Sequence, residues 1–159
     1  MNKVYLLIGG NIGDRMANLA MAVEFIEKYL GKMFQMSSIY ETAAWGNTNQ
    51  PAFYNQAIQL NTSLPPETLL AQLLAIEIEM GRVRTQKYGP RTIDLDILMM
   101  DDKVLDTNTL TIPHPQLHNR RFALLPLAEI APSLHHPILD KTVSELLVNC
   151  PDTLDVQKK

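Results

Sequence analysis

The sequence predicts an α+β fold, with an antiparallel sheet, helices packed on it, and a C-terminal extension of helices and loops. Two observations support this prediction. Segments with the two-residue period of strands and segments with the three- to four-residue apolar spacing of helices follow one another in the order β-α-β-β-α-β. The chain has 159 residues, of which 46% are hydrophobic and 19% charged, which suits one hydrophobic core. We therefore expect residues 1–159 to form a single domain.

The first three elements are strand, helix and strand. Residues 4–8 are continuously apolar and predict a buried strand, which the segment 9–13 ends because its glycines permit tight or left-handed backbone. Asp14 is a suitable N-cap for a helix that ends at Gly31. Its apolar stripe consists of Leu19, Val23, Ile26 and Leu30. Residues 33–42 then have the composition of a strand.

The next elements complete the pattern. Residues 52–62 alternate as a strand, and residues 65–67 begin a helix that ends at Gly81. Residues 93–100 return to the strand period, with Asp94 and Asp96 on one face and Ile93, Leu95, Ile97 and Met99 on the other. This order is that of the ferredoxin-like fold, an antiparallel sheet with two helices on one face. The extension should contain a short strand at 103–106 and helices near 121–131 and 142–149.

Charge and cysteine content exclude several classes of protein. The net charge is −3 and the pI about 5.8, which argues against a nucleic-acid binder that relies on bulk positive charge. Cys150 is the only cysteine, so an internal disulfide or a zinc site with several cysteines is excluded. The apolar run at the N-terminus is too short for a signal peptide or a membrane helix. We expect a cytoplasmic monomer with no membrane or nucleic-acid partner.

Asp94 and Asp96 are the sharpest candidate functional residues. At positions i and i+2 of a strand, their carboxylates lie on one face, roughly 6 to 7 Å apart. Mg²⁺ prefers carboxylate oxygen and often shares its coordination with substrate phosphates. The segment 82–91 precedes this pair and holds four cations and no acid, which leaves 10 basic against 17 acidic residues elsewhere. Arginines in such a loop suit phosphate binding. A solvated loop is the commoner outcome for a charged segment, but its position directly before the aspartate pair favours the functional interpretation.

The histidines and aromatic residues are less decisive. His114 and His118 have the spacing of a metal pair, but Pro113 and Pro115 break the helix that this spacing needs, so we do not favour zinc. A flat heterocycle could stack between Phe53 and Phe122 with Asn55 at its edge, or these side chains could belong to the core. No phosphate-binding glycine motif of the Walker or dinucleotide type occurs in the sequence. Any nucleotide is therefore expected to be held by metal ions and side chains.

The motifs together resemble those of the 6-hydroxymethyl-7,8-dihydropterin pyrophosphokinase family. The resemblance is carried by the run KYGPRTIDLDIL at 87–98 and by shorter matches, in the family's order, at 9–15, 38–42, 53–55, 81–84, 112–115 and 120–122. It covers roughly residues 3–135. It implies transfer of diphosphate from ATP to the hydroxymethyl group of the dihydropterin, with release of AMP, on a ferredoxin-like fold.

The resemblance also implies roles for individual residues. Asp94 and Asp96 would bind two Mg²⁺ ions, Arg82 and Arg91 would clamp the phosphates from a mobile loop, and Arg84 and Tyr88 would help this loop to close. The ATP side would be lined by Glu77, Ile97, Thr111, His114 and Arg120. The pterin would be held by Thr42, Ala43, Trp45, Phe53, Asn55 and Phe122, with Tyr88 and Asp94 beside it. The sequence departs from the family pattern at Gly10, where serine is usual, and at Thr109 and Pro115.

Other classes share parts of this pattern. A regulatory or RNA-binding module can have the same element order, although an RNA-binding sheet would be basic and rich in aromatic residues. A metal-dependent nuclease or glycosyl transferase could use the same pair of aspartates. Only a pyrophosphokinase is expected to bind MgATP and a pterin together.

Overall fold

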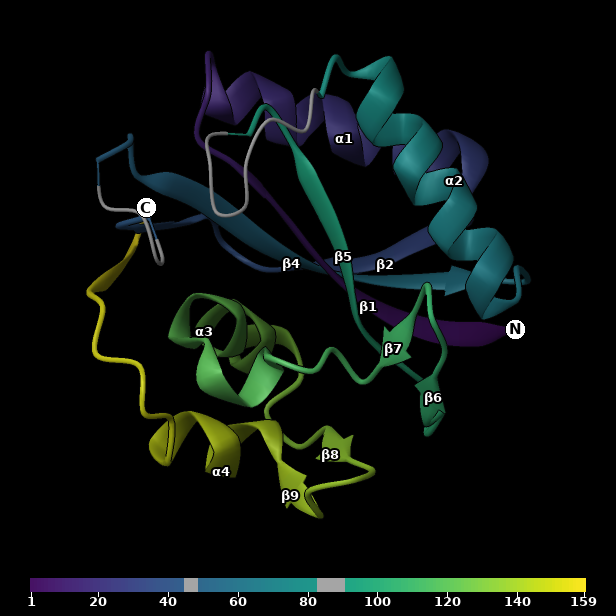
Figure 1. The fold of residues 1–159 in the computed structure, drawn as a ribbon, viewed down its shortest axis with the longest axis vertical. Helices are drawn as coiled ribbons and strands as arrows, with labels where there is room; N and C mark the ends of the chain where they lie inside the picture. The colour runs from purple at the N-terminus through teal and green to yellow at the C-terminus, as the bar shows by residue number, and fades with distance from the viewer. Residues whose placement is uncertain (45–48, 83–90) are drawn as a thin grey trace.

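An antiparallel sheet runs through the middle of the structure, which is a computed structural model and describes residues 1–44, 49–82 and 91–159. Helices α1 (Arg15–Tyr29) and α2 (Pro66–Glu79) cover one face of the sheet (Figure 1). Helices α3 (Arg121–Ile130) and α4 (Val143–Val148) lie on the opposite side. The α+β prediction and the ferredoxin-like order are confirmed, and the C-terminal extension proves to be the cover of the second face.

The strand order explains how distant parts of the sequence meet. It runs β10 (Val156–Lys158), β3 (Tyr40–Thr42), β4 (Phe53–Thr62), β1 (Asn2–Gly10) and β5 (Asp94–Met100), with every neighbouring pair antiparallel. Strand β2 (Lys32–Met36) pairs with another part of β4. The predicted strand at 33–42 is therefore two strands. Between them, Ser37 contacts β4 through two hydrogen bonds: its N–H donates to the Ala57 carbonyl and its Oγ accepts from the Ala57 N–H, each at 2.9 Å.

Two apolar clusters lie on the two faces of the sheet. The larger one packs β1, β4 and β5 against α1 and α2, and its fully buried members include Leu6, Ile58 and Leu73. The helix α1 begins as predicted, because Asp14 Oδ1 accepts from the Ala17 N–H at 3.0 Å. The second cluster packs the other face against α3 and α4 around Leu124. Because both clusters use the same sheet, each covers a face that would otherwise expose apolar side chains to water.

The expected alternation along β5 is wrong at its end. The pairing of β5 with β1 shifts after Ile97, so that Leu6 faces Ile97 whereas Tyr5 faces Met99. This bulge accommodates one extra residue and reverses the faces beyond it. Met99 consequently joins Leu98 in the α3 cluster, and Met100 joins the α1 and α2 cluster. The side chains before the bulge, including Asp94 and Asp96, keep the predicted faces.

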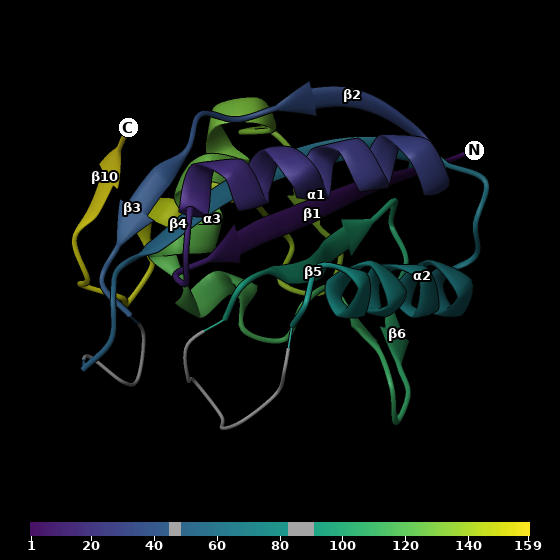
Figure 2. The ribbon, with the colours of Figure 1, turned by 90° about the horizontal axis from the view of Figure 1, so that it is seen from above.

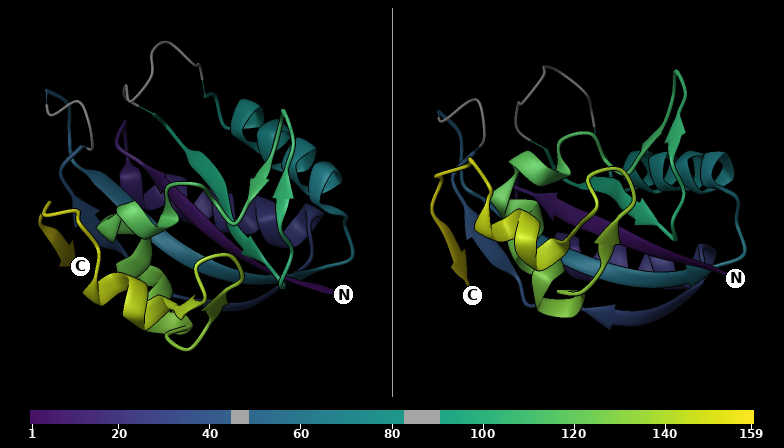
Figure 3. Two further views of the ribbon diagram at one scale, coloured as in Figure 1. Left: turned by 60° about the horizontal axis from the view of Figure 1, so that its bottom comes forward. Right: turned by 90° about the horizontal axis from the view of Figure 1, so that it is seen from below.

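The extension consists of short elements. These are β6 (Leu105–Asp106), β7 (Thr111–Ile112), the 3₁₀ turn η1 (Leu117–Asn119), β8 (His135–His136) and β9 (Lys141–Thr142). The predicted short strand at 103–106 and both predicted helices are present. After α4 the chain returns to the sheet, where β10 lies beside β3 (Figures 2 and 3). This return was not predicted.

Candidate active site

A pocket opens where the ends of four strands meet the start of α3. It is lined by Leu7, Gly9, Thr42, Ala43, Phe53, Asn55, Arg91, Asp94, Asp96, Arg120 and Phe122. The sheet register brings these residues together, because Gly9 of β1 faces Asn55 of β4 on one side and Asp94 of β5 on the other. Most of the side chains singled out in the sequence, both acidic and aromatic, therefore share one cavity.

The two aspartates of β5 differ in their surroundings. Asp94 is held by two arginines: its Oδ1 accepts from Arg82 Nη1 at 2.8 Å and its Oδ2 from Arg91 Nη1 at 3.0 Å. No hydrogen bond to the Asp96 carboxylate is found within the described part of the chain. Burial raises the pKa of Asp96, and the negative charges of Asp94 and Glu77 raise it further, against the opposing effect of Arg120 and Arg91. The Asp96 carboxyl group is therefore less readily ionised than that of an ordinary aspartate.

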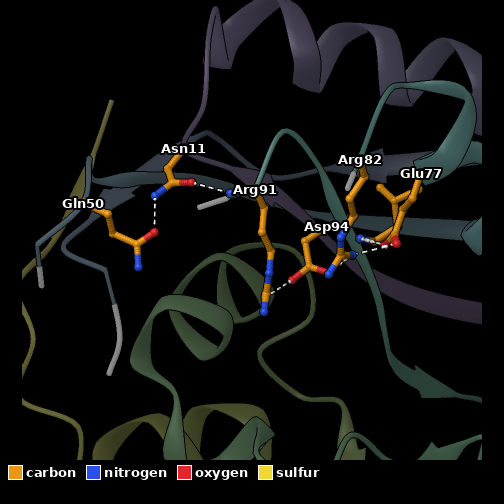
Figure 4. A network of polar contacts seen from close by, with 7 residues as sticks. Asn11, Gln50, Glu77, Arg82, Arg91 and Asp94 are labelled. Carbon is orange, nitrogen blue, oxygen red and sulfur yellow. Dashed lines mark hydrogen bonds and ion pairs between the residues drawn. The ribbon is translucent and has the colours of Figure 1, made fainter. Parts of the chain in front are cut away.

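Arg82 is a buried bridge between α2 and β5. Its Nη1 also donates to Glu77 Oε1 at 2.6 Å, and both side chains are about 5% exposed or less (Figure 4). The other oxygen of Glu77, Oε2, accepts from the Leu95 N–H at 2.7 Å. Glu77 is thus tied to the backbone of the strand that carries the aspartates. Its contacts fix Arg82 and β5 relative to each other.

The sequence analysis missed Asn11, which positions Arg91. Asn11 is 2% exposed and follows β1 directly. Its Oδ1 accepts from the Arg91 N–H at 2.8 Å, while its Nδ2 donates to Gln50 Oε1 and to the Pro51 carbonyl, both at 2.9 Å (Figure 4). The available signal was the position of Asn11, directly after two glycines at the end of a buried strand. An amide buried at such a place needs several hydrogen-bond partners.

Of the predicted ATP-side residues, Arg91 and Arg120 line the pocket, whereas Glu77, Ile97, Thr111 and His114 are not part of its lining. His114 follows β7, and its Nδ1 accepts from the Gln116 N–H at 3.1 Å. Burial lowers the pKa of His114 to about 4, helped by the positive charge of Arg120. The imidazole is therefore neutral at pH 7, and its Nε2 carries the proton. Ile97 is buried in the α1 and α2 cluster, and Thr111 Oγ1 donates to Asp106 Oδ1 at 3.3 Å.

The predicted pterin-side residues divide into two groups. Thr42, Ala43, Phe53, Asn55 and Phe122 all line the pocket. Trp45 and Tyr88 lie outside the described residues, as does Arg84, which was predicted on the ATP side. Gly9 and Leu7 also line the cavity and were not predicted to do so.

Comparison with known proteins identifies the family. Residues 5–132 match the family model of 7,8-dihydro-6-hydroxymethylpterin-pyrophosphokinase (HPPK). The chain belongs to this family. The 2-amino-4-hydroxy-6-hydroxymethyldihydropteridine pyrophosphokinase of Aquifex aeolicus is 43% identical over 145 residues, covering 91% of this chain and 90% of the relative. The protein of the same name from Methylorubrum extorquens is 43% identical over 148 residues, covering 92% of both chains.

The structural comparison agrees with the HPPK assignment at the level of the fold. A crystal structure of Plasmodium falciparum HPPK-DHPS matches with a TM-score of 0.75 at 20% identity, covering 93% of this chain and 43% of that chain. As an HPPK, this protein transfers diphosphate from ATP to the hydroxymethyl group of 6-hydroxymethyl-7,8-dihydropterin, a step of folate biosynthesis. In the described residues, none of the helices combines the length and the apolar run of a membrane span.

Proposed function

We propose that the pocket between β1, β3, β4, β5 and α3 is the active site of this HPPK. The observation that carries the proposal is the meeting of two carboxylates, Asp94 and Asp96, with the aromatic side chains of Phe53 and Phe122 in one cavity. A pterin is flat and has polar edges, so it suits stacking between aromatic rings. Asn55 is 5% exposed and presents an amide that can both donate and accept at the pterin edge.

Thr42 and Ala43 form the pocket wall next to Phe53. Thr42 pairs with Phe53 in the register of β3 and β4, so the wall and the aromatic ring are fixed to each other. We propose that this wall, together with Trp45, Tyr88 and Asp94, completes the pterin site. The pterin would then place its hydroxymethyl group toward β5.

The donor set of β5 fits Mg²⁺, and we propose two ions at Asp94 and Asp96. Groups of three or more metal-binding side chains are lacking among the described residues, so substrate phosphates and water would supply the remaining ligands. Burial is the main cause of the raised pKa of Asp96, and a bound cation would favour the ionised carboxylate against both burial and the charges of Asp94 and Glu77. Bound Mg²⁺ would neutralise charge on the triphosphate and align it for attack by the hydroxyl group.

Arg82 and Arg91 are proposed to exchange partners when ATP binds. Both oxygens of Asp94 accept hydrogen bonds from these arginines. Guanidinium groups bind carboxylate and phosphate with the same fork of donors. The arginines can therefore release Asp94 to a cation and turn to the phosphates, with Arg84 assisting. Glu77 keeps its bond to the Leu95 N–H during this exchange and holds β5 in place.

The ATP side of the site is proposed to include His114, Arg120, Thr111 and Ile97. A neutral His114 with its proton on Nε2 can donate a hydrogen bond to a phosphate oxygen without titrating near pH 7. Arg120 adds a positive charge at the pocket wall. Ile97 and Thr111 would contact the less polar parts of the nucleotide.

The wider setting is proposed on similar grounds. Both apolar clusters share one sheet, which supports a single domain, and we propose that this domain acts as a monomer. ATP and free Mg²⁺ are supplied in the cytoplasm, where we propose the enzyme works. No contact with nucleic acid is proposed for this net acidic chain.

The test of the proposed site is AMP release that depends on both Mg²⁺ and 6-hydroxymethyl-7,8-dihydropterin. We expect Asp96→Ala to lose at least about a hundredfold in kcat while its melting temperature stays near that of the parent. Asp102→Ala is the matched control, because Asp102 is an exposed acid just beyond the other end of β5. Parental AMP release by Asp96→Ala would contradict the metal assignment.

A further inference from the structure

Residues 150–159, which we call the C-terminal strap, connect two walls of the pocket. At one end, Asp152 Oδ2 accepts from the Arg121 N–H at 3.1 Å, at the start of α3. At the other end, the carbonyl oxygen of Asp155 accepts from Thr42 Oγ1 at 3.1 Å, and β10 pairs with β3. Figures 2 and 3 show this segment passing from α4 to the edge of the sheet. The strap thus contacts the wall that carries Phe122 and the wall that carries Thr42.

Asp152 supplies a cap that α3 lacks in its own sequence. The residue before the helix is Arg120, whose side chain makes no capping hydrogen bond. The first N–H groups of a helix need acceptors, and a carboxylate is favourable there. Asp152 Oδ1 also accepts from the Leu154 N–H at 3.0 Å, so the carboxylate is held at both oxygens.

The capped residue lies between two pocket-lining residues. Arg120 and Phe122 flank Arg121, and both face the cavity that contains Asp94 and Asp96. The far end of α3 is tied to the same strand as the strap, because Glu129 accepts from the Tyr40 hydroxyl and from the Ser38 N–H. The bond at Asp152 is therefore one of the contacts that hold the start of α3, where Phe122 lines the pocket.

We propose that Asp152 is a positioning residue for the pterin, acting through the start of α3 on Phe122. This inference rests on the proposed function, in which Phe122 stacks on the pterin. Asp152 itself does not line the pocket, and its role is to set where the ring of Phe122 lies before the substrate arrives. Loss of preorganisation of this kind weakens binding without removing a direct contact.

The experiment is a calorimetric titration of 6-hydroxymethyl-7,8-dihydropterin into enzyme saturated with Mg²⁺ and a non-hydrolysable ATP analogue. Asp152→Ala should weaken pterin binding about fivefold, the equivalent of losing one helix cap. Asp152→Asn keeps one oxygen acceptor and should fall between the parent and Asp152→Ala. Asp155→Ala is the matched control: it removes the same charge from the strap, but the Asp155 side chain is exposed and its carboxylate accepts a hydrogen bond from Gln157 within the strap.

A double-mutant cycle with Phe122→Ala separates positioning from general destabilisation. If Asp152 acts through Phe122, adding Asp152→Ala to Phe122→Ala should change pterin affinity by less than about twofold. Equal affinities for Asp152→Ala and Asp155→Ala, or additive losses in the cycle, would overturn the inference while leaving the proposed site intact. If Phe122→Ala itself binds pterin as the parent does, the stacking in the proposed function fails, and this inference fails with it.

Discussion

Gly9 gives the sharpest test of pterin recognition, because a methyl group there would collide with Asn55. A Cβ atom built on Gly9 would lie 2.0 Å from Asn55 Oδ1 and 2.9 Å from the carbonyl oxygen of Tyr54. The backbone of Gly9 has ordinary negative φ, in contrast to Gly13 at +70°. Glycine is therefore needed at position 9 because the Asn55 side chain lies so close to its Cα atom. The change Gly9→Ala should displace the Asn55 amide.

The size of the effect follows from this geometry. To restore an ordinary contact of about 3.4 Å, Oδ1 must retreat by about 1.4 Å, which exceeds the tolerance of a hydrogen bond. When a buried polar group of the pterin loses its hydrogen-bond partner, the free energy of binding weakens by about 1 to 3 kcal/mol. This corresponds to roughly a 5- to 150-fold rise in the pterin KM. The backbone contact with Tyr54 adds a loss of stability of about 1 to 3 kcal/mol.

The assay is AMP release measured against each substrate in turn. We expect Gly9→Ala to raise the KM for the pterin while the KM for ATP changes by less than about threefold. Gly13→Ala serves as the control, since a Cβ at Gly13 meets only the Asn18 amide at 3.9 Å and costs backbone strain alone. A folded Gly9→Ala enzyme with the parental pterin KM would refute the role given to Asn55.

Three further predictions concern stability. Glu77→Ala removes the carboxylate that accepts from the buried Arg82 guanidinium and from the Leu95 N–H. We expect the free energy of unfolding to fall by about 3 to 5 kcal/mol and the melting temperature to fall by about 10 °C in calorimetry. A shift of less than about 3 °C would contradict this. His114 has a folded pKa of about 4 and an unfolded value near 6.5, so the unfolded chain takes up the proton first as the pH falls. The contribution of His114 to the free energy of unfolding should be complete above about pH 6.5 and fall by up to about 3 kcal/mol toward pH 4. Urea unfolding of His114→Gln should not show this pH-dependent decrease. Burial and the hydrogen bond to Glu129 raise the pKa of Tyr40 to about 12. Tyr40→Phe removes this bond and should lower the free energy of unfolding in urea by about 1.5 kcal/mol. An unchanged free energy would show that the bond does not stabilise the fold.

The sequence was sufficient for the order of elements, because apolar period and end signals agree along most of the chain. Asp14 and Gly31 frame α1 as predicted, since a side-chain cap and a glycine after the helix act locally. The bulge after Ile97 could not be predicted, because it depends on how β5 pairs with β1 rather than on the residues of β5 alone. Strand β10 was missed for the same reason: Val156–Lys158 is short and gains its structure from the edge of β3.

The candidate site shows the same division between local and long-range information. Asp94 and Asp96 share a face because strand period alone decides it. The contacts of Asn11 with Arg91 and of Asp152 with Arg121 join residues far apart in the chain, so no local pattern reveals them. Gly9 was interpreted as a turn glycine, but the space it leaves is for a side chain on the neighbouring strand.

The distribution of charge explains how a net acidic chain can accommodate a triphosphate. Asp94 and Glu77 share Arg82, and Asp94 also binds Arg91, so the arginines are neutralised before any substrate arrives. A site that was strongly positive without substrate would attract phosphates of every kind. In the proposed exchange, the arginines would become available to phosphate when a cation takes over the carboxylates, because removing one charge from this partly buried network without replacing it is costly. The proposed partner exchange would therefore favour nucleotide that arrives together with its metal ions over free nucleotide, and it needs no excess of positive charge in the protein.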